Sequence, residues 1–267
     1  MTKLYLATEK MIAEKADGIG WMTFNNPKRR NAIGFAMREA ILKIIDDFNN
    51  DDEVRVIVMR GAGDKAFVSG SDISEFAERR ATPEQRAVYD ALSSKVNAAY
   101  ESIEKPLIAM IRGFCIGGGL GTALQADLRL AAEGSEYGVP AAKLALGYSY
   151  HNMKKLIDIV GPAKTKEIMF TARRFSAQEA LDMGLINQLV PANKLEERVR
   201  ELAANIAQNA PLTIKASKTI INEAIKNPDE RDIELCDELV ENCMNSDDYR
   251  EGRSAFMEKR IPKFVGR

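Results

Sequence analysis

Histidine and cysteine are scarce in this chain, and their scarcity limits the chemistry that it can carry out. Among 267 residues there is one histidine, His151, and there are three cysteines. A single histidine excludes a metal site built on several histidines. The cysteines at positions 115, 236 and 243 have neither the spacing of metal ligands nor that of a disulfide framework. We therefore expect no metal site and three reduced, buried thiols.

A large net charge and long apolar segments are also absent from the sequence. The 38 Lys and Arg residues nearly balance the 39 Asp and Glu residues, and the formal net charge of −1 gives no support for nucleic acid as a partner. No stretch reaches the roughly 18 apolar residues of a membrane span, and the N-terminal residues lack the apolar core of a secretion signal. We predict a cytoplasmic protein that binds neither a membrane nor a nucleic acid.

Strand-like and helix-like segments alternate in the first part of the chain. The apolar segments 54–59, 106–111 and 128–132 are typical of buried parallel strands. Before the first of them, apolar residues recur at helical spacing, and Arg38 and Lys43 occupy the opposite, polar side of that helix. This alternation favours an α/β fold whose ligand sites lie at the carboxyl ends of the strands.

Helical patterns dominate the second part of the chain, with one short strand predicted near residues 185–190. The helical segments follow Gly161-Pro162 and cover residues 163–171, 176–183, 195–207, 211–224 and 228–245. We therefore predict two parts, a core over residues 1–195 and a helical C-terminal region over residues 196–267.

Two glycine-containing turns follow predicted strands. The first contains Ser69, Gly70 and Ser71, and the second is the triplet Gly117-Gly118-Gly119 at the start of a helix-like stretch. Glycine reaches positive φ without steric cost and lets a ligand approach the backbone, and free N–H groups at a helix start favour negative charge. Two N–H groups converging from these turns would form an oxyanion hole for an enolate or a tetrahedral oxyanion.

Several motifs together resemble the crotonase superfamily, also called the enoyl-CoA hydratase/isomerase family, across essentially the whole chain. They are NNPKRRNA at 25–32, KAFVSGSDI at 65–73, GFCIGGG at 113–119, ADLRLA at 126–131 and EGRSAFMEKR at 251–260. The resemblance implies an α/β fold of stacked ββα units, the ClpP/crotonase-like fold, with a helical C-terminal trimerisation region. It further implies an acyl-CoA substrate, no cofactor beyond the CoA moiety of that substrate, and a homotrimer or a hexamer built as a dimer of trimers.

The resemblance also implies roles for particular residues. The oxyanion-hole N–H groups fall on Ser71 and Gly118, in agreement with the two glycine turns. Residues expected to contact CoA are Lys28, Arg30, Ala32, Ala66, Ser69, Ile73, Gly117, Phe256 and Lys259. Alternatives stay open for two parts of this set, because residues 28–30 could form a solvated turn and Phe256 could be an ordinary core aromatic.

The acid–base pair of the family's hydratases has no counterpart in this sequence. Those enzymes use two glutamates to add water, and the two positions fall on Gly121 and Ala141, which cannot move a proton. The catalytic candidates that remain are Tyr148, since decarboxylating members have a tyrosine near this position, and His151, whose ordinary pKa is near neutrality.

Both catalytic candidates have a structural alternative. Tyr148 and Tyr150 could wall the acyl pocket while His151 caps the next helix. Asp72 and Glu75 form an acidic pair near the first glycine turn, and Asp72 could take part in catalysis or accept backbone N–H bonds as a cap.

The sequence thus predicts an enoyl-CoA hydratase/isomerase-like enzyme, a lyase or isomerase, that acts through an oxyanion-hole-stabilised enolate and is a poor hydratase. One alternative is a decarboxylase, isomerase or C–C lyase that uses residues 148–151. Another is a non-catalytic acyl-CoA-binding protein.

Overall fold

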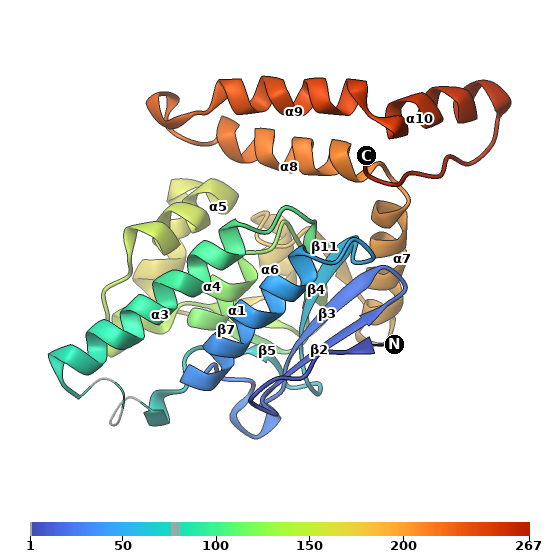
Figure 1. Ribbon diagram of the computed structural model, residues 1–267. Coiled ribbons are helices and arrows are strands. Elements are labelled where there is room, and N and C mark those ends of the chain that lie inside the picture. Colours follow the sequence, from blue (N-terminus) through green and yellow to red (C-terminus); the bar gives the residue numbers. More distant parts are fainter. Residues whose placement is uncertain (1, 76–78, 80) are drawn as a thin grey trace.

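Two β-sheets form the centre of the structure, a computed structural model that describes residues 2–75, 79 and 81–267 (Figure 1). The larger sheet has the strand order β1-β2-β3-β4-β6-β8-β11. The first three strands are antiparallel, and those from β3 to β11 are parallel. Their bounds are Thr2–Lys3, Met11–Ala16, Ile19–Phe24, Val56–Gly61, Leu107–Ile111, Leu128–Ala132 and Gln188–Val190.

Three of the four strands in the smaller sheet each come directly after a strand of the larger sheet in the chain. Its order is β10-β9-β7-β5, with β5 at Ala66–Val68, β7 at Phe114–Ile116, β9 at Glu136–Gly138 and β10 at Phe175–Ser176. Each of β4, β6 and β8 is followed by β5, β7 or β9, and then by a helix. This repeat is the predicted stack of ββα units, and it brings the ends of β5 and β7 side by side because these two strands pair in parallel.

The helices of the core form where the sequence has an apolar stripe or a clear start signal. Helix α1, Phe35–Asn49, buries one face through residues such as Ile41 and Phe48. Helix α3, Pro83–Glu101, begins with a capping box between Thr82 and Gln85. Helices α4, α5 and α6 cover Gly118–Ala123, Tyr150–Thr171 and Ala177–Asp182.

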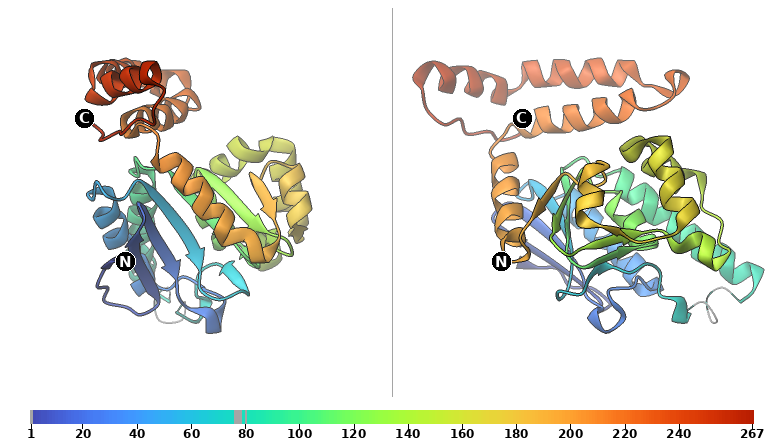
Figure 2. Two further views of the ribbon diagram at one scale, coloured as in Figure 1. Left: turned by 90° about the vertical axis from the view of Figure 1, so that its right-hand side faces the viewer. Right: turned by 180° about the vertical axis from the view of Figure 1, so that it is seen from behind.

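Helix α7, Leu195–Ala207, covers the second face of the larger sheet (Figure 2). Its buried residues Leu195, Val199 and Ala203 pack with Trp21 and neighbouring strand residues in a cluster of their own. The guanidinium groups of Arg60 and Arg200 both contact the ring of Trp21, at 4.5 and 4.6 Å from the ring centre. The first helix beyond the predicted boundary at residue 195 therefore packs on the core sheet.

Three further helices stand apart from the sheets (Figures 1 and 2). Helices α8, Pro211–Ala224, and α9, Ile233–Asn245, lie against each other, and α10, Asp247–Glu258, follows with the C-terminal tail. Large apolar side chains remain exposed on this part of the chain. They are Ile221, Ile225, Ile233, Val240, Met244, Tyr249, Phe256, Met257, Ile261 and Val265.

Several local expectations differ from the structure. Helix α5 begins at Tyr150 rather than at residue 163, because Gly161 has non-helical angles (φ 76°, ψ 167°) and Pro162 interrupts the periodic pattern that the sequence shows. Helix α10 was missed because charged residues dominate it. All three cysteines are free, but only Cys115 is buried. Within the described residues, none of the helices combines the length and the apolar character needed to cross a bilayer.

Candidate active site

The two glycine turns converge in the structure. Gly70, with φ of 113°, follows β5, and Gly117, with φ of 58°, follows β7. A Cβ atom added to Gly118 would lie 3.5 Å from the backbone nitrogen of Ser71, and one added to Gly70 would lie 3.6 Å from the nitrogen of Gly118. The two nitrogen atoms predicted to bind an oxyanion are therefore neighbours, although they lie 47 positions apart in the chain.

Both N–H groups are available for a ligand. Ser71 forms a parallel β-bridge with Ile33, in which Ile33 N–H donates to the Gly70 oxygen and Asp72 N–H donates to the Ile33 oxygen. In this pattern the N–H of Ser71 points away from Ile33. Gly118 is the first residue of α4, so its N–H has no acceptor within the helix. Neither group donates to another atom among the described residues.

Close packing holds the second turn against the first strand. A Cβ atom at Gly119 would lie 1.8 Å from the Val68 carbonyl oxygen, so only glycine fits at this position. Gly121, one of the two positions on which the resemblance places a hydratase acid, is different. A Cβ there would meet no atom of the described residues within 4 Å, whereas the second position, Ala141, is buried. The space that an acidic side chain would fill at residue 121 is open.

Tyr148 lies at the second glycine turn. Its hydroxyl donates to the Gly117 carbonyl oxygen at 3.3 Å. Burial raises the pKa of Tyr148 to about 12, so its hydroxyl is protonated at neutral pH and can donate a hydrogen bond but cannot act as a base. Tyr150, expected as a possible pocket wall, is 77% exposed in the single chain.

His151 is the second residue of α5, and its side chain faces Glu101 at the end of α3. Its Nδ1 is 3.5 Å from Oε1 of Glu101, and its Nε2 is buried without a hydrogen-bond partner among the described residues. Lys155 approaches the same carboxylate at 3.7 Å, and burial lowers the pKa of Lys155. The idea that His151 caps the helix is wrong, because the Ser149 side chain accepts the capping hydrogen bond from Asn152 N–H.

Asp72 and Glu75 fix the loop that carries Ser71. One carboxylate oxygen of Asp72 accepts hydrogen bonds from the backbone and the hydroxyl of Ser74, at 3.1 and 2.6 Å. Glu75 accepts the N–H of Phe35 at 2.7 Å and so caps the N-terminus of α1. Asp72 therefore has the capping role that was one of its two predicted alternatives, and the cap that Glu75 provides for α1 was not predicted.

Arg38 was missed at the sequence level. Its guanidinium donates to the hydroxyl of Ser71 at 3.0 Å and to the carbonyl oxygens of Ile33 and Gly34 at 2.9 and 3.3 Å. No sequence pattern indicated this contact, since Arg38 falls on the polar side of α1, where a residue is expected to face solvent.

Most residues expected to contact CoA lie beside the two turns. Asn31 is fully buried and donates to the Ala66 carbonyl oxygen at 2.8 Å, which fastens the loop of Lys28, Arg30 and Ala32 to β5. Ser69 N–H donates to the Arg30 oxygen at 3.1 Å. The same region includes Gly117 and Ile73, and the Ile73 side chain is 73% exposed. Residues 28–30 are all exposed, as expected for a solvated turn, and Arg30 lies over the Phe114 ring at 4.9 Å.

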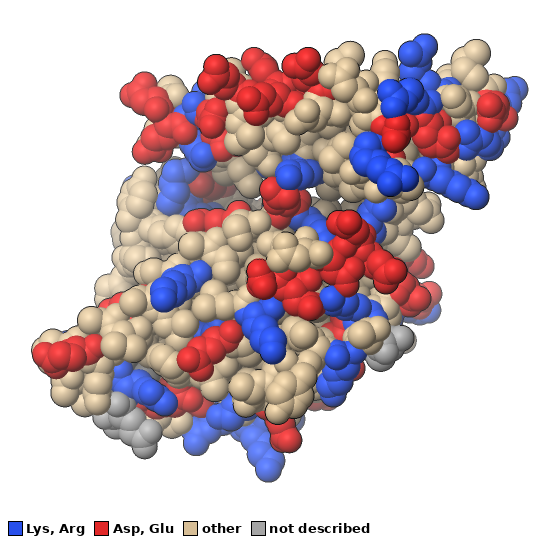
Figure 3. All heavy atoms as spheres, viewed as in Figure 1, with Lys and Arg blue, Asp and Glu red and all other residues tan. Residues whose placement is uncertain are grey.

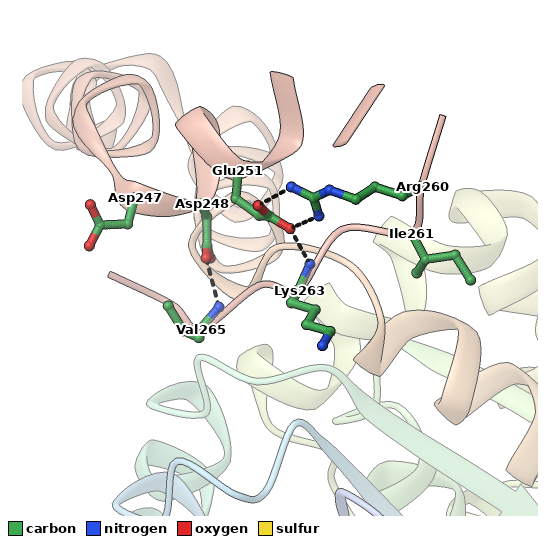
Figure 4. A pocket seen from close by; sticks show the side chains of 7 residues that line it. All are labelled: Asp247, Asp248, Glu251, Arg260, Ile261, Lys263 and Val265. Carbon is green, nitrogen blue, oxygen red and sulfur yellow. Dashed lines mark hydrogen bonds and ion pairs between the residues drawn. The ribbon is translucent and has the colours of Figure 1, made fainter. Parts of the chain in front are cut away.

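Phe256 and Lys259 lie elsewhere in the single chain, on and just after α10 (Figure 1). Phe256 is 83% exposed, so the alternative that it is a core aromatic is wrong for this chain. Hydrogen bonds hold the C-terminal tail, residues 260–266, against α10, and the two segments line an open pocket (Figure 4). Glu251 accepts from Arg260 and from Lys263 N–H, and Asp248 accepts from the N–H groups of residues 265 and 266.

Charged clusters away from the glycine turns have internal partners. Acidic side chains gather at the end of α1 (Figure 3), and there Lys15 bridges Asp47 and Asp51 at 2.6 Å each. In the part of the chain that the structure describes, no group of three His, Cys, Asp or Glu side chains is placed to hold a metal ion. The converging glycine turns thus stand out as the candidate active site.

Known proteins resemble this chain over nearly its whole length. The family model for enoyl-CoA hydratase/isomerase matches residues 14–267. The short-chain-enoyl-CoA hydratase of Clostridium acetobutylicum is 34% identical over 250 residues, which cover 94% of this chain and 95% of that protein. The carnitinyl-CoA dehydratase of Salmonella typhi is 35% identical over 254 residues, or 92% of this chain and 94% of that protein.

Solved structures agree with this result. The crystal structure of an enoyl-CoA hydratase/carnitine racemase from Magnetospirillum magneticum superimposes with a TM-score of 0.92 at 32% identity, and the match covers 98% of this chain and 97% of that one. A family protein from Hyphomonas neptunium gives a TM-score of 0.90 at 35% identity, covering 97% and 98% of the two chains. The chain belongs to the enoyl-CoA hydratase/isomerase family, the crotonase superfamily.

Proposed function

We propose that this protein is an acyl-CoA enzyme that binds the thioester oxygen of its substrate between the N–H groups of Ser71 and Gly118. Two convergent, unoccupied backbone donors carry this proposal. Negative charge appears on the thioester oxygen when the α-carbon becomes nucleophilic, and donors already aimed at that oxygen stabilise the enolate more than the ground state. The activities named for its relatives support a CoA thioester as the substrate.

The CoA moiety would lie along the loop of residues 28–32 and beside β5. Lys28 and Arg30 supply positive charge for phosphate groups, while backbone near Ala32, Ala66, Ser69, Ile73 and Gly117 would bind pantetheine. Phe256 and Lys259 are distant in the single chain, so they would reach CoA from a neighbouring subunit. We therefore propose a homotrimer or a dimer of trimers, in the cytoplasm.

Hydration is a poor fit to the proton chemistry of this site. Addition of water needs one group to deprotonate water and another to protonate the α-carbon, and general acid–base catalysis of this kind contributes about 10²–10⁴-fold. Gly121 and Ala141 supply neither group. Tyr148 is held protonated, and His151 is engaged with Glu101.

Decarboxylation is the second candidate, and the same oxyanion hole favours it. Loss of CO₂ from a malonyl-type thioester leaves an electron pair that forms the enolate directly, so no base is required. Only the later protonation of the α-carbon needs a donor, which water or the protonated Tyr148 can supply. The open space at Gly121 would accommodate a substrate substituent.

A ligand that reports enolate stabilisation tests the oxyanion hole without knowledge of the natural substrate. Acetoacetyl-CoA ionises to an enolate with its own near-ultraviolet band, and a functioning oxyanion hole must lower the pKa of that ionisation when the ligand is bound. A bound ligand that titrates as it does in free solution would argue for a non-catalytic acyl-CoA-binding protein.

Mass spectrometry of product mixtures then identifies the reaction. The panel contains crotonyl-CoA, β,γ-unsaturated, malonyl-type and hydroxyacyl thioesters. Conversion of the malonyl-type ester with little conversion of crotonyl-CoA is the expected result, and fast hydration of crotonyl-CoA would overturn the expectation of a poor hydratase.

A further inference from the structure

We infer that Arg38 is a positioning residue of the oxyanion hole, acting through Ser71. The inference rests on the proposed function, because it assigns a role in stabilising the same enolate. It concerns this chain's own pair of side chains, a guanidinium on α1 and a hydroxyl on the residue that supplies the first backbone donor.

The geometry links Arg38 to both strands of the bridge that presents Ser71. One guanidinium nitrogen donates to the carbonyl oxygens of Ile33 and Gly34, and the other donates to the Ser71 hydroxyl at 3.0 Å. Ile33 is the residue that bridges Ser71. A single side chain thus holds the Ile33 backbone and the Ser71 side chain together, and this restricts the direction of the Ser71 N–H.

Packing fixes the guanidinium itself. Its central carbon lies 4.6 Å from the ring centre of Tyr89, and Tyr89 is only 2% exposed. Stacking on a buried ring removes rotamer freedom from an otherwise flexible side chain. The hydrogen bond to Ser71 is therefore part of a rigid arrangement that also includes α1 and α3.

The positive charge of Arg38 can offset the negative charges of the loop that carries Ser71. The loop of residues 70–75 carries the carboxylates Asp72 and Glu75, and Asp72 is 5% exposed. A negative oxygen at the Ser71 N–H would be repelled by these nearby like charges. Arg29 offers partial compensation from 3.7 Å, but its side chain is 57% exposed and screened by water. Arg38, stacked and half-buried, supplies a better-ordered positive charge next to Ser71.

The contact with Arg38 also makes the Ser71 hydroxyl a stronger hydrogen-bond donor. Because its oxygen accepts a hydrogen bond from a guanidinium, its own proton is free to donate elsewhere and is a stronger donor than in a neutral pair. Ser71→Ala would remove this link while leaving the backbone N–H in place.

The test measures the enolisation pKa of bound acetoacetyl-CoA in the full-length protein. In the parent this pKa should lie below that of the free ligand. Arg38→Met should raise it by about one unit, a tenfold loss of enolate stabilisation, since an opposite charge a few ångströms away shifts a pKa by that order. Affinity for CoA itself should change little. Ser71→Ala should shift the pKa in the same direction by a smaller amount.

The matched control is Lys43→Met. Lys43 is on the same helix, carries the same charge and donates to one backbone carbonyl, that of Tyr5 at 3.0 Å, outside the candidate site. It should leave the enolisation pKa unchanged. If Arg38→Met and Ser71→Ala both titrate like the parent, the role assigned to Arg38 is wrong while the oxyanion hole stands. A parent protein that shifts nothing would overturn the oxyanion hole and this inference together.

Discussion

At the residue scale, the groups proposed to bind substrate belong to the backbone. Side chains form hydrogen bonds to the residue or the peptide unit that supplies each of these groups. The carbonyl of Gly117 and the N–H of Gly118 belong to one peptide unit, and Tyr148 donates to that carbonyl. Hydrogen bonding to the carbonyl polarises the peptide and strengthens its N–H as a donor. Tyr148 and Arg38 would thus support one oxyanion donor each, a role that requires no proton transfer.

Installing the missing acids should create hydratase activity. The double variant Gly121→Glu with Ala141→Glu should raise the hydration rate of crotonyl-CoA by roughly 100-fold or more, because general acid–base catalysis contributes on that order. The open space at Gly121 accepts the first side chain without a clash. The rate is followed by loss of the enoyl thioester absorbance.

The corresponding double glutamine variant is the control for size and polarity. It should hydrate crotonyl-CoA no faster than the parent. Equal rates for the glutamate and glutamine variants, in proteins that are folded, would mean that the two positions do not face the bound acyl group.

Tyr148 should make stability depend on pH in the alkaline range. Its pKa is about 12 in the folded state and about 10 when unfolded. The tyrosine is neutral in both states below pH 10. As the pH rises from about 10 to about 12, Tyr148 ionises in the unfolded state but stays neutral in the folded state, so the free energy of unfolding falls over this range. Tyr148→Phe should cost about 1 kcal/mol at pH 7 from the lost hydrogen bond, and this cost should shrink by about 1 kcal/mol at pH 11.

Urea unfolding at the two pH values measures this difference. Tyr5→Phe, at a tyrosine that is 85% exposed, is the control and should change stability little at either pH. A cost of Tyr148→Phe that is the same at pH 7 and pH 11 would contradict burial of the Tyr148 hydroxyl.

At the element scale, the contact between β5 and α4 sets the distance between the two oxyanion donors. Gly119 allows the first turn of α4 to touch the Val68 carbonyl, and the parallel pairing of β5 with β7 aligns the two glycine turns. A short helix held at its first turn by backbone packing needs few side chains of its own. The site therefore depends on glycine at Gly119 more than on any side chain of α4.

Two alanine substitutions on α4 should have opposite effects. Gly119→Ala forces a methyl group to within 1.8 Å of the Val68 oxygen, so α4 must move and stability should fall by roughly 2 kcal/mol or more. Gly121→Ala meets no atom and should stabilise the protein by up to about 1 kcal/mol through helix propensity. Thermal unfolding distinguishes them, and similar melting temperatures for the two variants would contradict the close packing at Gly119.

At the scale of the whole molecule, the sequence predicted what local patterns encode. Apolar runs identified the core strands, and glycine placement identified both turns. Contacts between distant segments were not predictable. Arg38 belongs to the polar side of its helix by periodicity, yet its side chain contacts Ser71. His151 contacts Glu101, which lies 50 positions earlier in the chain. Neither contact produces a periodic pattern in the sequence, because each depends on how segments distant in the chain pack together.

The C-terminal helices present an apolar surface that the chain itself does not cover. On α9, Ile233, Val240 and Met244 are spaced by seven and four residues, so they share one face, and each is about half exposed. Ile221 on α8 and Ile225, the residue that follows this helix, form a similar exposed pair. Exposed apolar surface of this extent marks an interaction site, and we expect a second copy of the chain to cover it.

Charged substitutions on α9 should therefore dissociate the oligomer. Val240→Asp with Met244→Asp removes two buried side chains from each proposed interface, worth roughly 3–6 kcal/mol. Size-exclusion chromatography with light scattering should show smaller particles, and affinity for CoA should fall as well, since Phe256 and Lys259 would come from the neighbour.

Tyr5→Asp, on an exposed residue outside the C-terminal region, should change neither property. A parent protein that is monomeric at micromolar concentration and still binds CoA tightly would show that one chain forms the complete site, and Phe256 and Lys259 would then have no part in it.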